Sequence, residues 1–380
     1  MTLRARGGRR LRCLVERIVV NRSRGGEFGA PSPAALSFHR QLPEYAPSPL
    51  RDAAPLAEML GLEHVWVKDE ATRFGLPSFK YLGASWAVAR LLGAAQPDGL
   101  AAAAARMGVR RLVAATDGNH GRAVARVARQ IGLEATIYVP SGMVPARRQA
   151  IADEGASVTD AAGDYDTAVR MATSDAADPT ARVVNDADQD GTSQVPGWVI
   201  EGYSTLFLEL QDQLPASAGP VDLVVLQLGV GAFAAAGVRW AAMHDVRPVG
   251  AEPIGAPCVA LSLAAGAPQT VDAAGTTMAG LDCQTPSHAA FPTLAAGLLG
   301  VVLLKDSEAD DATRLLAGAG VESGESGAAG VAGLKALAGD AACGPLREAV
   351  DWSSVQSVLV VNTEGATDPE RYRMVVGHSA

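Results

Sequence analysis

Arg-Phe-Gly-Leu-Pro-Ser-Phe-Lys-Tyr-Leu-Gly-Ala-Ser-Trp, residues 73–86, is the most informative stretch of this chain. It places one lysine, Lys80, among apolar and small residues directly before a run that favours a helix. Burial disfavours a charged ammonium and lowers its pKa, and a neutral, desolvated amine can form a Schiff base. From this stretch alone, a lysine with a buried stem and a solvated head is an equally good interpretation.

Short β-branched runs alternate with alanine-rich runs along much of the chain. Strands are predicted at 64–68, 111–115, 135–139, 157–159, 222–227, 249–251 and 358–362, and helices at 85–92, 122–131, 145–154, 165–174 and 232–243. Continuous apolar strands that alternate with helices indicate parallel sheets covered on both faces. Because ligands bind beyond the carboxyl ends of such strands, the turns that directly follow strands are the candidate site.

The composition excludes several classes of function. The 380 residues carry a formal net charge of −9, which argues against a nucleic-acid surface. No run of about 18 apolar residues is free of glycine and charge, so no membrane span is expected. The four cysteines, at 13, 258, 283 and 343, are scattered without a CxxC pair, so neither a metal site nor a disulfide framework is predicted. A reduced, cytoplasmic protein fits this pattern.

Three further turns follow predicted strands. Thr116-Asp-Gly-Asn-His-Gly121 opens a helix, where free backbone N–H groups favour an anion and Asn119 could contact a phenolic oxygen. Gly229-Val-Gly-Ala-Phe233 lets the backbone approach a phosphate, although it matches neither GxGxxG nor a Walker loop. Asn362-Thr-Glu-Gly365 carries a hydroxyl, that of Thr363, which could face a ring nitrogen. Taken singly, the first and last turns are also explained as helix caps, and the glycine turn is weak evidence.

Together, the lysine and the three turns suggest pyridoxal 5′-phosphate (PLP) as cofactor. Lys80 would hold the aldehyde, the glycine turn the phosphate and Asn119 the ring hydroxyl. A neutral hydroxyl beside the ring nitrogen, in place of a carboxylate, would leave that nitrogen unprotonated. Such a ring draws in less carbanion charge, which suits β-elimination better than transamination.

Longer motifs strengthen this interpretation. They are Val-Lys-Asp-Glu (67–70), Phe-Lys-Tyr-Leu-Gly (79–83), Ala-Thr-Asp-Gly-Asn-His-Gly-Arg (115–122), Trp-Val-Ile-Glu-Gly-Tyr (198–203), Gly-Ala-Glu-Pro (250–253), Met-Ala-Gly-Leu (278–281), Glu-Ser-Gly-Glu-Ser-Gly (322–327) and Asn-Thr-Glu-Gly-Ala-Thr-Asp-Pro (362–369). With these motifs in this order, the chain resembles the fold type II (tryptophan synthase β-like) PLP-dependent enzymes and, within them, the diaminopropionate ammonia-lyase family. The resemblance runs from about residue 30 to the C-terminus. The turn with Asp117 is the most specific motif, because other members of the fold usually carry Ser or Thr there.

The resemblance implies an α/β fold of two three-layer α/β/α domains with mostly parallel sheets. It also implies α,β-elimination of 2,3-diaminopropionate, as the D or L enantiomer, to pyruvate and ammonia via aminoacrylate. Lys80 would be the Schiff-base lysine, and Asp117 and Asp186 would be the other catalytic residues. The two aspartates would act as bases for opposite enantiomers or bind a substrate ammonium, and Lys80 itself is a further candidate for the base. Cofactor contacts would come from Lys80, Asn119, Gly229, Val230, Gly231, Ala232, Phe233 and Thr363.

The same resemblance sets the expected organisation of the chain. An N-terminal arm is expected at 1–40, a large PLP-binding domain at 41–85 and 195–380, and a small domain at 86–194 inserted in the large one. The partner would be a small amino-acid substrate, and a homodimer is expected.

One segment departs from the family pattern. After the second aspartate the family usually reads Trp, an acidic residue or Pro, Gly and Tyr, whereas this chain reads Asp186-Ala-Asp-Gln-Asp-Gly-Thr192. Aromatic side chains there would close and dry the pocket, so their loss predicts a wetter, wider or differently covered site. The change is explained either as loop drift with retained activity or as a changed substrate in a specialised pathway.

Other functions remain open at this point. A threonine or serine dehydratase, or a synthase that adds a nucleophile to aminoacrylate, would keep the fold, but Asp117 weighs against both. A non-catalytic PLP-fold binding protein is disfavoured by the presence of Lys80, Asn119 and Gly231. An unrelated nucleotide-binding α/β protein lacks support because neither phosphate fingerprint is present.

Overall fold

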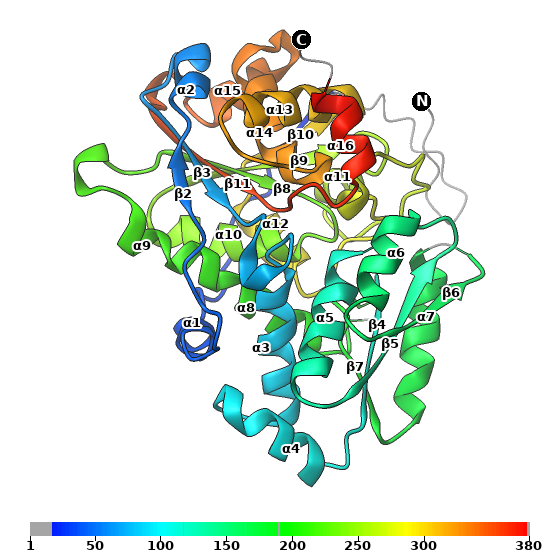
Figure 1. Ribbon diagram of the computed structural model, residues 1–380. Coiled ribbons are helices and arrows are strands. Elements are labelled where there is room, and N and C mark those ends of the chain that lie inside the picture. The colour runs from blue at the N-terminus through cyan, green and yellow to red at the C-terminus, as the bar shows by residue number, and fades with distance from the viewer. Residues whose placement is uncertain (1–16, 117, 164, 189–190, 378–380) are drawn as a thin grey trace.

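The structure is a computed structural model of the chain, and it describes residues 17–116, 118–163, 165–188 and 191–377. Its strands form two sheets (Figure 1). The larger sheet consists, in spatial order, of β1 (Ile18–Val20), β10 (Gly300–Leu304), β9 (Arg247–Pro253), β8 (Leu223–Gln227), β11 (Ser357–Asn362), β3 (His64–Asp69) and β2 (Leu50–Asp52). The smaller sheet consists of β6 (Ser157–Ala161), β5 (Glu134–Pro140), β4 (Arg111–Ala115) and β7 (Ala181–Val183).

Helices follow most of the strands. The α-helices are α1 (Pro33–His39), α2 (Ala54–Leu60), α3 (Lys80–Leu92), α4 (Leu100–Arg106), α5 (Asn119–Gln130), α6 (Pro145–Ala152), α7 (Tyr165–Ser174), α8 (Val195–Leu208), α9 (Leu210–Gln213), α10 (Ala232–Met243), α11 (Cys258–Ala265), α12 (Phe291–Gly297), α13 (Asp306–Gly318), α14 (Glu325–Gly339), α15 (Gly344–Ala349) and α16 (Pro369–Val376). Short 3₁₀ helices are η1 (Arg73–Gly75), η2 (Pro97–Gly99), η3 (Asp175–Ala177), η4 (Ala216–Ala218), η5 (Ala279–Leu281), η6 (Ala341–Cys343) and η7 (Trp352–Ser354). Among the described residues, no helix is both long and apolar enough to cross a membrane.

Both sheets are mainly parallel and covered on both faces, as the sequence predicts. All pairs of the smaller sheet are parallel, and in the larger sheet the edge strands β1 and β2 pair antiparallel. Successive side chains of a strand point to opposite faces. In β8, Leu226 packs into the core beneath α8 and α10, and Val225 packs into the core beneath α13 and α14. In β4, Leu112 faces the α5 side and Val113 faces the α7 side.

Helix α3 joins the two sheets, because it contacts α8 beside the larger sheet and α5 beside the smaller one. The buried residues of these three helices belong to one apolar core. The part of the predicted arm that the structure describes includes β1, which pairs with β10. The predicted division into an arm and two domains stays a prediction.

The predicted strands are all present, with ends within two residues of the prediction. Two helices begin earlier than predicted: α3 at Lys80 rather than at residue 85, and α5 at Asn119 rather than at residue 122. In each, a glycine lies inside the helix, whereas the sequence predicts Gly121 in the turn before it. A Cβ on Gly83 would come within 2.4 Å of Tyr203 Cε1, and one on Gly121 within 2.3 Å of Thr116 Cγ2. These glycines therefore serve close packing rather than chain reversal.

Candidate active site

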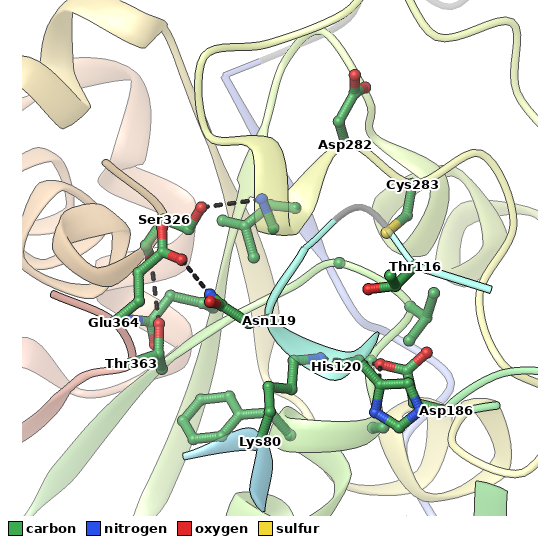
Figure 2. Close-up of a pocket in the computed structure, with 18 of the residues that line it drawn as sticks. Lys80, Thr116, Asn119, His120, Asp186, Asp282, Cys283, Ser326, Thr363 and Glu364 are labelled. Carbon is green, nitrogen blue, oxygen red and sulfur yellow. Dashed lines mark hydrogen bonds and ion pairs between the residues drawn. The ribbon is translucent and has the colours of Figure 1, made fainter. Parts of the chain in front are cut away.

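One pocket lies where strands of both sheets end (Figure 2). Every described residue that the sequence predicts for the site lines it: Lys80, Asn119, Asp186, Gly229, Val230, Gly231, Ala232, Phe233 and Thr363. Asp117, the remaining predicted residue, lies outside the described residues. The strand-exit turns are far apart in the sequence, and the parallel topology brings their side chains together as expected.

Lys80 is the first residue of α3 and lies at the foot of the pocket. Its Nζ donates a hydrogen bond of 2.8 Å to Asp186 Oδ2, and the exposed fractions of the two side chains are 20% and 8%. The same Nζ lies 5.5 Å from the ring centre of Phe79 and 5.9 Å from that of Tyr203. Among the described residues, the Lys80 ammonium therefore contacts the Asp186 carboxylate and two aromatic rings, so it is largely withdrawn from water.

Asp186 is ionised in this environment. Burial alone would raise the pKa of its carboxyl, but the Lys80 ammonium and nearby His120 lower it to about 2. His120 Nε2 lies 2.6 Å from the Val184 carbonyl oxygen, which can only accept, so Nε2 carries the proton. Burial lowers the pKa of His120, and its other nitrogen lies 4.0 Å from Asp186 Oδ2.

The glycine turn ends β8 and leads into α10. Gly231 has a φ of 93°, in the left-handed region, and directly precedes the first helical residue, Ala232. A Cβ on Gly229 would lie 2.9 Å from the Gly280 carbonyl oxygen. No described side chain caps α10, so the N–H groups of its first turn lack a capping partner. This arrangement suits an anion such as a phosphate group.

Asn119 opens α5 on the opposite wall of the pocket. Its Nδ2 donates a hydrogen bond of 2.5 Å to Glu364 Oε2 (Figure 2). The Thr363 hydroxyl lies 3.5 Å from the Ser326 carbonyl oxygen, and the Ser326 hydroxyl accepts a 3.0 Å bond from the Gly280 N–H. Thus the last strand exit supplies a hydroxyl and a carboxylate to the same wall.

The loop after Asp186 is described in part. Ala187 and Asp188 are half-buried, and residues 189 and 190 lie outside the described residues. Gly191, with a φ of 71°, packs against His288. The sequence-based expectation of a wetter or wider pocket stays a prediction.

The residues present fit PLP, which supplies one aldehyde, one phosphate and one aromatic ring with a hydroxyl. A half-buried amine, an uncapped helix N-terminus after glycines and an amide donor line one pocket, and each matches one of these groups. The described residues contain no group of three or more His, Cys, Asp or Glu side chains that could hold a metal ion.

Such a fold with such a site defines the class of α/β enzymes that bind PLP between two sheets. The chain matches the model of the pyridoxal-phosphate dependent enzyme family over residues 42–350, and it belongs to that family. It is 35% identical to a diaminopropionate ammonia-lyase of Salmonella typhimurium over 91% of this chain and 92% of that protein.

Solved structures support the same family and fold. The diaminopropionate ammonia-lyase of Escherichia coli, solved in complex with an aminoacrylate–PLP azomethine intermediate, superposes with a TM-score of 0.85 at 30% identity and covers 99% of this chain and 98% of that one. A threonine deaminase from Solanum lycopersicum has the same fold, with a TM-score of 0.73 at 20% identity over 97% of this chain and 99% of that one. The predicted fold type II architecture is thereby confirmed.

Several residues that line the pocket were not predicted from the sequence as site residues. His120 is one of them, and its Nδ1 lies 4.0 Å from Asp186 Oδ2. Glu364 is another, because only the Thr363 hydroxyl of that turn was predicted to face the cofactor. A carboxylate directly after a buried strand, next to glycine, was the available signal, since an acidic residue is rarely buried without a partner.

Proposed function

We propose that this protein is a PLP-dependent ammonia-lyase that converts 2,3-diaminopropionate to pyruvate and ammonia by α,β-elimination. The observation that carries the proposal is the Lys80–Asp186 ion pair, which lines the same pocket as the uncapped N-terminus of α10. The similarity to diaminopropionate ammonia-lyases over nine-tenths of the chain supports this substrate.

Binding of the cofactor would use the three strand exits. Lys80 would hold the aldehyde carbon, residues 229–233 would hold the phosphate through backbone N–H groups, and Asn119 would donate to the ring hydroxyl. Thr363 also lines the pocket, where its neutral hydroxyl could face the ring nitrogen without protonating it. When bound, PLP withdraws electrons from the α-carbon of an attached amino acid and so weakens its C–H bond.

The side chains around Lys80 would transfer the protons of the reaction. Asp186 Oδ2 accepts the hydrogen bond from Lys80 Nζ, so it can take a proton from that nitrogen or receive one from the substrate. Asp117 is proposed as the second carboxylate that can act as a base, and Lys80 Nζ is a further candidate for the base. A base removes the α-proton, the C–N bond at the β-carbon breaks, and the electron pair leaves with ammonia. Aminoacrylate then reacts with water to give pyruvate and a second ammonia.

The substrate carries two amino groups, and the pocket is acidic enough to receive a cation. Asp186, Asp282 and Glu364 all line it. Either aspartate of the predicted pair can bind a substrate ammonium as well as remove a proton.

The proposal includes a homodimer located in the cytoplasm. The three cysteines within the described residues, Cys258, Cys283 and Cys343, are buried and form no disulfide, which suits a reducing compartment. Sedimentation of the purified protein would test the dimer, and a monomer at micromolar concentration would contradict it.

The cofactor is tested by absorption. The purified protein, or the protein after addition of PLP, is expected to show a visible band that Lys80→Ala lacks. Lys335→Ala, at a half-exposed lysine that pairs with Asp311 on the surface, is the matched control and should keep the band. A wild-type protein that takes up no PLP would contradict the proposed function as a whole.

The substrate is tested by pyruvate release from D- and L-diaminopropionate, serine and threonine. Faster release from either diaminopropionate than from the hydroxy amino acids is expected, and Asp117→Asn and Asp186→Asn should affect the two enantiomers unequally. A PLP-loaded protein that prefers serine or threonine would instead be a dehydratase.

A further inference from the structure

Glu364 is a pocket residue whose buried carboxylate is not explained by packing. Its side chain is 3% exposed, yet it is a carboxylate next to a ligand pocket. Oε2 accepts the 2.5 Å bond from Asn119 Nδ2, and Oε1 is buried without a hydrogen-bond partner among the described residues. A buried carboxylate oxygen without a hydrogen-bond partner costs stability, so we expect this side chain to serve another purpose.

The backbone of Glu364 is fixed from two sides. It forms an isolated antiparallel bridge with Ser78, and the next residue, Gly365, donates 3.0 Å to the Pro77 carbonyl oxygen. On the other side, the Glu364 carbonyl oxygen accepts a 3.1 Å bond from the Gly324 N–H. A Cβ on Gly324 would lie 3.0 Å from Glu364 Oε1, so this turn leaves just enough room for the side chain.

These contacts link Glu364 to both residues that would hold the cofactor. Its backbone is tied to the segment two residues before Lys80, and its side chain is tied to Asn119 at the start of α5. Asn119 belongs to the part of the chain that contains the smaller sheet, whereas Glu364 directly follows the strand β11 of the larger one. Glu364 therefore fixes how far the Asn119 amide stands from the lysine.

The carboxylate also fixes which way the amide faces. An ionised carboxylate can only accept hydrogen bonds, whereas the end of an asparagine side chain has one accepting oxygen and one NH₂ group with two donors. Against Glu364, the favourable orientation places Nδ2, not Oδ1, toward the carboxylate. The second N–H of Nδ2 then remains for another acceptor, and the ring oxygen of PLP is one.

We propose that Glu364 is a positioning residue that orients the Asn119 amide so that its N–H, rather than its carbonyl oxygen, meets the ring oxygen of the cofactor. The inference rests on the proposed function, since it requires PLP in this pocket. Replacing the carboxylate by an amide removes the constraint, because glutamine can donate as well as accept and so allows Asn119 to turn over.

The test is the dissociation constant of PLP from the full-length chain, together with the position of its visible band. Glu364→Gln is expected to weaken PLP binding by about tenfold, the value of one hydrogen bond to a charged oxygen. It is also expected to shift the band, which responds to hydrogen bonding at the ring oxygen. The control is Glu322→Gln, at an exposed residue whose carboxylate accepts 3.2 Å from the Ala366 N–H, and it should leave both readouts as in wild type.

A double-mutant cycle separates positioning from a general loss of structure. If Glu364 acts through Asn119, the effect of Glu364→Gln on PLP binding and on the band should vanish in the Asn119→Ala background. Equal effects in both backgrounds would overturn the inference, and so would a Glu364→Gln protein with wild-type affinity and spectrum. Should Glu364→Gln fail to fold, Glu364→Asp replaces it, because its shorter side chain does not reach Asn119 and the same weakening is expected.

The outcomes for the two proposals are distinct. A wild-type protein that does not bind PLP contradicts the proposed function itself. A wild-type protein that binds PLP and eliminates diaminopropionate, with an unaltered Glu364→Gln variant, contradicts the role of Glu364 alone.

Discussion

Lys80 Nζ and Asp186 Oδ2 lie 2.8 Å apart and join the first residue of α3 to the segment that follows β7. Both side chains are largely removed from water, at 20% and 8% exposure. Burial alone would favour the protonated acid, but the ammonium reverses that preference and holds the pKa of Asp186 at about 2. The pair is therefore charged in the absence of cofactor, and the Asp186 carboxylate is available as a hydrogen-bond acceptor.

Asp186→Asn is expected to destabilise the cofactor-free protein by roughly 2 kcal/mol near neutral pH. The folded-state pKa of Asp186 lies below that of an unfolded aspartate, so its contribution is present above about pH 4 and is lost as the pH falls toward 2. Urea unfolding of wild type and Asp186→Asn at about pH 6 and pH 3 measures this contribution. The difference between their free energies of unfolding should shrink at the lower pH. A constant difference would show that the Lys80–Asp186 pair does not contribute through its charge.

Arg73→Met is expected to destabilise the protein by about 3–5 kcal/mol, because it removes the buried guanidinium that Glu70 and Glu209 share and leaves their negative charges less well compensated. Arg73 is 3% exposed and donates hydrogen bonds to Glu70 and Glu209, and Glu209 also accepts from Lys68. The network lies just ahead of the segment that carries Lys80, so its loss should also reduce PLP binding.

The control for Arg73 is Arg40→Met. Arg40 pairs with Asp212 at the surface, where the side chains are 52% and 70% exposed, so a change of less than about 1 kcal/mol is expected. The free energies of unfolding in urea measure both variants. Similar free energies of unfolding for Arg73→Met and Arg40→Met would mean that the buried network is not a major source of stability.

The sequence predicts the parts of the site that depend on strand periodicity. Continuous apolar runs identify β3, β4, β8 and β11, and in a parallel sheet the carboxyl ends of such strands lie along one edge. Lys80, Asn119 and Thr363 could therefore be placed at one site without knowledge of the structure. Their convergence follows from topology, which the pattern of strands and helices largely determines.

Contacts between residues distant in the sequence could not be predicted in this way. The interior positions of Gly83 and Gly121 depend on Tyr203 and Thr116, which approach too closely for a Cβ. Likewise, the bond from Asn119 to Glu364 spans 245 positions and depends on how the two sheets are placed. Local propensity carries no information on such approaches, so a glycine in a helix resembles a glycine in a turn.

Gly231→Ala is expected to weaken PLP binding by about tenfold or more, through one lost hydrogen-bonding position in the phosphate turn. Gly231 has a φ of 93°, and an alanine Cβ would lie 2.5 Å from Leu294 Cδ1, so the Leu294 side chain or the turn must shift. Gly266→Ala is the matched control, since Gly266 also has a left-handed φ, of 71°, but nothing within 4 Å of the added Cβ and no contact with the pocket.

Both glycine variants should lose about 1 kcal/mol of stability from backbone strain. Titration with PLP distinguishes them, because the control is expected to bind as wild type does. If both bind PLP equally well, the glycine turn does not hold the phosphate.

His39→Gln is expected to make the protein less sensitive to acid. His39 ends α1 and is fully buried, with Nδ1 2.7 Å from the Thr205 hydroxyl and Nε2 3.0 Å from the Leu82 carbonyl oxygen. Burial, followed by the charge of Arg73, lowers the pKa of His39 from 6.5 to about 3. As the pH falls through 6.5, the unfolded chain binds a proton that the folded protein does not take up until about pH 3, so stability falls, by about 4 kcal/mol over this range.

Glutamine keeps a side-chain donor for the Leu82 carbonyl oxygen but has no group that titrates in this range. The stability of the His39→Gln protein relative to wild type should therefore rise steadily as the pH is lowered from about 7 toward 4.5. Urea midpoints at several pH values measure the slope, and because all other groups are shared, the difference isolates His39. Parallel curves for the two proteins would show that His39 can be protonated in the folded state, and the buried position between α1, α3 and α8 would then have to admit a charge.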